Sequence, residues 1–138
     1  MRLLSFQARR FAWEPHSKTL EDGDEAPPAG ERTEAVVAFL HCEAKDQEPD
    51  ERARAFRHVL KHLKWIAGKQ GWKRVVLHSF THLGGENASS DFAREFLAEL
   101  ATRLRQTGYE VAITPFGWFC AWELSVLGDS LAKVWKQV

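Results

Sequence analysis

The chain contains few cysteines, and its charges cancel. Cys42 and Cys120 are the only cysteines, and residues 1–10 do not resemble a secretory signal, so we expect free thiols and a soluble, reducing, cytoplasmic location. No apolar run approaches the roughly 20 residues of a membrane span, so we expect no membrane partner. The 19 basic residues balance the 19 acidic ones, so the whole molecule has no bulk attraction for polyanions. Contact with nucleic acid would have to come from a local patch.

Several catalytic and metal-binding patterns are also absent. The sequence has no internal repeat, no Gly-x-Ser-x-Gly nucleophile elbow and no recognisable Ser-His-Asp pattern. His58 and His62 share one helix face, but no glutamate follows His58 as in zinc proteases. The other possible ligands match no zinc spacing: His41, Cys42, His78 and His82. We therefore predict no metal and no cofactor.

The composition is typical of one globular domain. The 138 residues are 44% hydrophobic and 12% aromatic, and we assign residues 1–138 to a single domain. Residues 2–13 predict a strand, a turn near Ala8-Arg9-Arg10 and a returning strand. Residues 21–34 are rich in Asp, Glu, Pro and Gly, which predicts an exposed acidic loop. Residues 35–40 form an uninterrupted apolar run, typical of a central strand covered on both faces.

Two long helices are predicted from their apolar periodicity and their ends. Apolar residues recur at three- and four-residue steps over residues 50–68, with Asp50 as a possible cap. Ser89 or Ser90 caps a second helix that ends before Gly108. The remaining predicted elements are short: strands at residues 75–77, 109–113 and 120–126, and a final helix capped by Asp129 and Ser130. Strands interleaved with helices indicate a layered α/β or α+β architecture.

Two segments at strand ends have the turn chemistry of ligand sites: residues 79–83 (SFTHL) and 115–122 (PFGWFCAW). Together with residues 1–4 (MRLL), 36–39 (VVAF) and Gly128 followed by Leu131-Ala132, their order and spacing resemble the archaeal-type editing domain of threonyl-tRNA synthetase. The resemblance extends over essentially the whole chain. It implies the fold of D-aminoacyl-tRNA deacylases, a compact sheet with two long helices on one side, and a homodimer.

The resemblance implies an aminoacyl-tRNA deacylase that removes mischarged serine from threonine-accepting tRNA. In this family the ester is hydrolysed largely by the substrate's own ribose hydroxyl and a positioned water. The chain ends at Val138 with no synthetase or anticodon-binding domain behind it, so we expect action in trans on the tRNA 3′ end, unless it is an excised fragment. Two alternatives are a binding protein that has lost catalysis and a subunit that docks on a separate threonyl-tRNA synthetase.

The resemblance also assigns the pocket residues. His82 is the best preserved, and its imidazole would orient water or ribose near neutral pH; alternatively it only satisfies loop carbonyls. The substrate-binding residues carried over are Cys42, Glu43, Ser79, Phe80, Thr81, Gly117, Trp118 and Phe119. Trp118 is our candidate for stacking on the terminal adenine.

The chain departs from the family pattern at Phe119-Cys120, where the family has Tyr-Lys, and at Lys133, where it has a glutamate in the last helix. One hypothesis is that Lys133 replaces the missing pocket cation; the alternative is a solvated charge. A second hypothesis makes Cys120 a thiolate nucleophile; the alternative is a small apolar strand residue. The departures also fit the loss of catalysis.

A basic surface is predicted over residues 52–74, opposite the apolar stripe of the first helix. We assign the tRNA backbone to its central cations: Arg54, Arg57, Lys61 and Lys64. The alternative is an ordinary solvated helix face.

Overall fold

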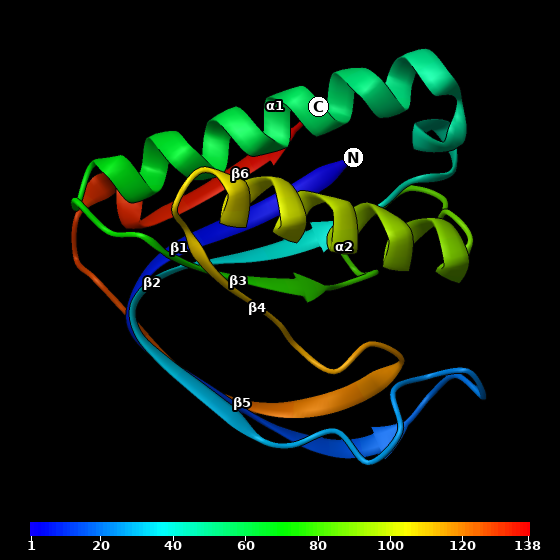
Figure 1. Ribbon diagram of the computed structural model, residues 1–138, viewed down its shortest axis with the longest axis horizontal. Coiled ribbons are helices and arrows are strands. Elements are labelled where there is room, and N and C mark those ends of the chain that lie inside the picture. The colour runs from blue at the N-terminus through cyan, green and yellow to red at the C-terminus, as the bar shows by residue number, and fades with distance from the viewer.

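The computed structural model describes residues 1–138, and it shows a six-stranded mixed sheet with two helices on one of its faces (Figure 1). The elements are β1 (Arg2–Lys18), β2 (Gly30–His41), α1 (Pro49–Gly68), β3 (Arg74–Ser79), α2 (Ser90–Gln106), β4 (Glu110–Ile113), β5 (Trp118–Val126) and β6 (Lys133–Gln137). The predicted layered architecture and the two long helices are confirmed. Neither helix is long and apolar enough to cross a membrane.

The sheet order is β4-β3-β2-β1-β5, with β6 paired to the first part of β1. β2, β3 and β4 are parallel because α1 and α2 cross over between them, whereas β1 is antiparallel to β2, β5 and β6. β2 is therefore an internal strand, as the apolar run of residues 35–40 indicated. The parallel unit places the carboxyl ends of β2 and β3 at the same edge of the sheet, where ligand sites are commonly built.

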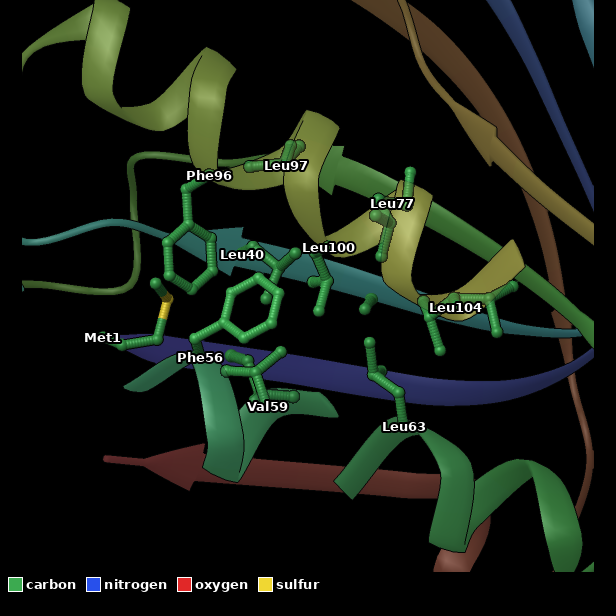
Figure 2. Packing of buried hydrophobic residues seen from close by; sticks show 14 of the residues in the cluster. Met1, Leu40, Phe56, Val59, Leu63, Leu77, Phe96, Leu97, Leu100 and Leu104 are labelled. Atoms are coloured by element: carbon green, nitrogen blue, oxygen red, sulfur yellow. The ribbon is translucent and has the colours of Figure 1, made fainter. Parts of the chain in front are cut away.

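The main core fills the space between the helices and the sheet (Figure 2). The predicted apolar stripes of both helices face it, and Phe56 of α1 meets Phe96 of α2 edge-on with ring centroids 5.6 Å apart. A second, smaller cluster lies on the opposite face of the sheet. On that side the last part of β1 and β5 curve away from the helices (Figure 1). That cluster includes Phe11, Trp13 and Phe39. Phe80 and Cys120, which pack against this cluster, also line the cavity described below.

The predicted turn near residues 8–10 is wrong. β1 runs without a break through this segment, and the extra residue is absorbed by a register shift between Ala8 and Arg10 in its pairing with β5. Arg10 then lies between two neighbouring strands and pairs with Glu31 of β2 at 2.8 Å and with Glu123 of β5. The sequence reads as a turn because the bulge interrupts the alternation that a flat strand would show.

The predicted acidic loop is shorter than residues 21–34, since β2 already begins at Gly30. The remaining loop is docked rather than free. One Asp24 carboxylate oxygen accepts from the Phe116 backbone N–H at 2.8 Å, and the other pairs with Arg94 of α2 at 3.2 Å. The Asp24 carbonyl accepts from the Trp118 indole N–H at 2.7 Å. The loop thereby closes one side of the turn between β4 and β5.

The start of α1 and the last predicted helix also differ from the predictions. Glu48 occupies the N-cap of α1, and Asp50 lies inside its first turn. For α2, the predicted Ser89 cap is confirmed, because its side chain accepts from the Phe92 N–H at 3.2 Å. The expected final helix is only a 3₁₀ turn, Ser130–Ala132, and the chain then enters β6, which the sequence analysis missed.

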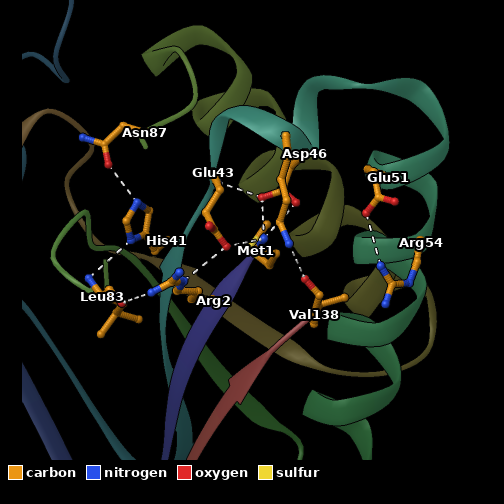
Figure 3. Close-up of polar contacts among 11 residues, drawn as sticks. Met1, Arg2, His41, Glu43, Asp46, Glu51, Arg54, Leu83, Asn87 and Val138 are labelled. Carbon is orange, nitrogen blue, oxygen red and sulfur yellow. Dashed lines mark hydrogen bonds and ion pairs between the residues drawn. The ribbon is translucent and has the colours of Figure 1, made fainter. Parts of the chain in front are cut away.

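The N-terminal ammonium is buried. The Met1 nitrogen lies 2.9 Å from a Glu43 carboxylate oxygen and 2.7 Å from an Asp46 carboxylate oxygen, in the segment that follows β2 (Figure 3). Arg2 approaches Glu43 from the other side at 3.5 Å. The Met1 charge is compensated only because this segment folds back over the start of β1.

Candidate functional site

A cavity of about 350 Å³ opens at the carboxyl end of β3. Its walls come from Thr19 and Leu20 after β1, Cys42 after β2, residues 78–82, the start of α2 with the loop before it, and residues 115–120 with Trp122. The two motif segments, far apart in sequence, therefore face one hollow. This volume is typical of small-molecule sites.

The turn before β5 is built around Gly117. This residue has a positive φ of 76°, and an added Cβ would lie 2.7 Å from the Gly23 Cα. The Gly117 carbonyl accepts from the Thr19 N–H at 2.7 Å. Backbone thus packs on backbone between this turn and the docked loop, and the contact fixes how Trp118 and Phe119 enter the cavity wall.

One wall of the cavity is aromatic. Trp122 of β5 meets His78 of β3 edge-on at 5.2 Å and Phe80 at 5.9 Å, and Phe80 in turn contacts His82 at 5.3 Å between ring centroids. Phe119 is 61% exposed and Trp122 41% exposed. No lysine, arginine, aspartate or glutamate lines the cavity. Any polar recognition inside it must come from neutral groups and histidine.

His78 is a site residue that the sequence analysis considered only as a metal ligand. Its Nδ1 lies 2.7 Å from the Thr114 hydroxyl, and burial lowers the pKa of the imidazole from 6.5 to about 4. Strand alternation was the available signal, because Leu77 faces the helices and His78 therefore faces the cavity side. His78 is neutral at physiological pH.

Two buried histidines predict acid sensitivity. Burial lowers the pKa of His62, helped by the nearby charge of Lys136, and burial alone lowers that of His78, in both cases from 6.5 to about 4. Between these values the unfolded chain binds protons that the native state does not, so stability falls as pH drops from about 6.5 to about 4. Each histidine contributes on the order of 3 kcal/mol to that loss. Urea unfolding of the wild type and of His78→Gln across this range measures it. The free energy of unfolding should depend less steeply on pH for His78→Gln than for the wild type. The exposed-site control His58→Gln should show the wild-type pH dependence, and the same dependence for all three proteins would refute the assignment.

Asn87 and His41 form a second polar pair beside the cavity. The His41 Nε2 lies 2.8 Å from the Asn87 Oδ1, and the Leu83 N–H donates to the His41 Nδ1 at 3.3 Å (Figure 3). His41 is fully buried, whereas Asn87 lines the cavity. Sequence reasoning named His41 only as a possible ligand and did not identify Asn87, because their contact depends on the loop before α2 closing over the end of β2.

Comparison with known proteins decides the family. A family model described as the archaea-specific editing domain of threonyl-tRNA synthetase matches residues 1–138. The chain belongs to this family. It is 33% identical over 141 residues to a threonine–tRNA ligase of Methanopyrus kandleri and 34% identical over 135 residues to that of Pyrobaculum aerophilum. These alignments cover 100% and 97% of the chain but only 22% of each relative.

A solved structure supports the fold of this editing domain. The protein named c-Myc DNA Unwinding Element Binding Protein superposes with a TM-score of 0.65 over 100% of this chain and 99% of that one, at 14% identity. At this identity the match concerns the fold alone. It confirms the D-aminoacyl-tRNA deacylase-like layered architecture that the sequence resemblance implied.

Most of the residues assigned to the site of the editing domain line the cavity. They are Cys42, Ser79, Phe80, Thr81, His82, Gly117, Trp118, Phe119 and Cys120. Glu43 does not line it, because its carboxylate is engaged by the Met1 ammonium. Burial raises the pKa of the Cys120 thiol and raises that of Cys42 to about 12. Both thiols are therefore protonated at neutral pH, which argues against a Cys120 thiolate nucleophile.

The structure does not bring Lys133 to the cavity. This residue begins β6, opposite Phe6 of β1, and its ammonium donates to the Leu127 carbonyl at 3.4 Å. The cavity wall meets β1 much farther along, where Lys18 pairs with Trp118. Lys133 is separated from the cavity by most of the length of β1. It therefore does not replace the missing pocket cation within this chain.

The predicted tRNA-contacting cations lie along α1. Arg57 and Lys61 are exposed, whereas Arg54 pairs with Glu51 at 3.2 Å and Lys64 lies over the Tyr109 ring.

No group of three or more histidine, cysteine, aspartate or glutamate side chains is arranged to hold a metal ion.

Proposed function

We propose that this chain hydrolyses the ester that joins a wrong amino acid to tRNA, releasing serine from threonine-accepting tRNA. One observation carries the proposal: the two segments typical of the editing family, far apart in sequence, line one cavity of about 350 Å³. A cavity of this size suits a terminal adenosine with a small amino acid attached. Residues 1–138 contain both the core and every wall of the cavity, so we propose that they are sufficient for this hydrolysis.

The chemistry would be supplied mainly by the substrate. The ester is more reactive than an amide, and the ribose hydroxyl next to it can orient a water molecule for attack. The role of the protein would be to hold the amino acid, exclude bulk water and position the attacking oxygen. His82, at the cavity rim against Phe80, is the group proposed to orient that water or the ribose.

We propose that the tRNA end is held by stacking and by distant phosphate contacts. Phe119 is the most exposed aromatic of the wall, whereas the Trp118 indole is engaged by Asp24. Phe119 therefore suits the terminal adenine better than Trp118, our sequence-based candidate. The exposed cations Arg57 and Lys61 of α1 are proposed to contact the RNA backbone.

A deacylation assay tests the enzyme directly. Threonine-accepting tRNA charged with serine should lose it in the presence of the chain, while the same tRNA charged with threonine is spared, since one methyl is worth about 1 to 3 kcal/mol in a fitted pocket. His82→Ala should reduce the rate by about 10²-fold. His58→Ala, on the exposed face of α1, is the matched control and should retain the wild-type rate. Full activity of His82→Ala would remove His82 from the mechanism.

A second function, binding without turnover, is favoured by one observation. The cavity holds Phe119 and Cys120 where the family resemblance expects Tyr-Lys, and no lysine or arginine lines it. A chain that binds charged tRNA in a salt-sensitive way but leaves the ester intact would be a binding module.

The homodimer and the separate synthetase partner are further proposals. Trp135 of β6, 54% exposed, supplies apolar surface for either interface.

A further inference from the structure

The tautomer of His41 is fixed by its surroundings. The Leu83 backbone N–H donates to Nδ1 at 3.3 Å, and a backbone amide can only donate, so Nδ1 carries the lone pair. The ring is fully buried at the end of β2. In the neutral imidazole the proton must then sit on Nε2, and Nε2 donates to the Asn87 Oδ1 at 2.8 Å.

The orientation of the Asn87 side chain follows from this tautomer. Its oxygen faces the proton of His41, so its amino group faces away from His41 (Figure 3). The amino group makes no hydrogen bond within the protein, and Asn87 is one of the residues that line the cavity. Asn87, a residue of the cavity wall, thus carries a neutral double donor whose direction is set by a buried histidine.

We propose that Asn87 is a catalytic residue that donates a hydrogen bond to the carbonyl oxygen of the aminoacyl ester, with His41 as its positioning residue. This inference rests on the proposed deacylase function. Water adds through its oxygen to the ester carbon, and the carbonyl π pair moves onto the carbonyl oxygen. The tetrahedral intermediate then expels the ribose oxygen, which takes up the proton lost by the water. Asn87 stabilises the negative charge between these two steps.

The composition of the cavity explains why such a donor is needed. Cys120 is a protonated thiol, Phe119 has no polar atom, and Lys133 lies elsewhere. A neutral amide held in place before the reaction stabilises an oxyanion without the cost of reorientation. Asn87 belongs to the cavity wall, and its donor direction is fixed by the buried His41.

Two substitutions separate this role from a structural one. Asn87→Asp keeps an oxygen that accepts from His41 but removes both donor hydrogens, whereas Asn87→Ala removes the whole contact. Both should lower kcat of seryl-tRNA deacylation by about 10²-fold, with KM changed much less. Glu86→Gln, an exposed neighbour in the same loop, should retain the wild-type kcat. If Asn87 only braced His41 and the loop, Asn87→Asp would resemble the wild type, and that result would overturn the inference.

The positioning role of His41 is tested by a double-mutant cycle. His41→Gln should lower kcat in the wild-type background but have no further effect in Asn87→Ala, because it acts only through Asn87. Thermal unfolding confirms that each variant is folded at the assay temperature. Additive losses would show that His41 acts independently and would refute the relay.

A binding measurement separates this inference from the proposed function. A non-hydrolysable 3′-seryl-amido adenosine carries the same carbonyl, and Asn87→Asp should weaken its binding by about tenfold in titration calorimetry. If the wild type binds this analogue but fails to hydrolyse seryl-tRNA, the enzyme proposal fails while the donor role stands. Equal affinity of wild type and Asn87→Asp would refute the donor role even in an active enzyme.

Discussion

Replacing Asp46 by alanine should lower the free energy of unfolding by about 3 kcal/mol, because the buried Met1 ammonium loses one of its two carboxylate partners and keeps only Glu43. The Met1 ammonium is completely buried, and Asp46, only 1% exposed, approaches it at 2.7 Å. Asp46 also accepts from the Glu43 N–H at 2.7 Å, so the substitution leaves a second buried donor unpaired. For a domain of ordinary stability this is a large fraction of the total.

The measurement is urea unfolding at neutral pH, with Glu51→Ala as the control. Glu51 also makes an ion pair, to Arg54 at 3.2 Å, but that pair is exposed on α1 and should contribute less than about 1 kcal/mol. Similar losses for both variants would mean that the buried pair contributes no more than a surface pair does.

Gly117→Ala should both destabilise the domain and abolish most of its activity. The positive φ of 76° costs a residue with a side chain about 1 to 2 kcal/mol, and the new Cβ would lie 2.7 Å from the Gly23 Cα, where backbone cannot yield easily. The turn must therefore separate from the docked loop. Since Trp118 and Phe119 follow it directly, a displacement of about 1 Å should lower the deacylation rate by about 10²-fold.

Gly128→Ala is the matched control, because an added Cβ at that glycine meets nothing within 4 Å and its φ is not positive. This control should keep the wild-type rate and unfold within about 0.5 kcal/mol of the wild type. Deacylation kinetics and unfolding of both variants give the comparison. A fully active Gly117→Ala would mean that the contact with Gly23 does not position the cavity wall.

The regular elements could be predicted because their signals are local. The apolar periodicity of α1 and α2, the Ser89 cap and the buried run of β2 each depend on a few neighbouring residues. The sequence-based predictions failed where strand pairing decides the structure. A bulge at Ala8 and Arg10 resembles a turn, and β6 is a strand because β1 offers it a partner edge.

The site was predictable in part for the same reason. The segments around His82 and Phe119 were found from turn chemistry and family resemblance, and both line the cavity. The assignment of Glu43 to the substrate could not be corrected from sequence, since its carboxylate is bound by a terminus 42 residues away. Asn87 went unnoticed because nothing adjacent to it in the chain reveals its partner.

The sequence by itself determined the family, the layered architecture and the two segments that build the cavity. Only the tertiary structure decided which polar groups the cavity contains. Glu43 pairs with the N-terminal ammonium, Lys133 lies on β6 far from the cavity, and Asn87 contacts His41. The physical reason is that secondary structure follows from short-range sterics and periodic burial, whereas the direction of a charge or a hydrogen-bond donor depends on partners that only the folded chain brings into contact.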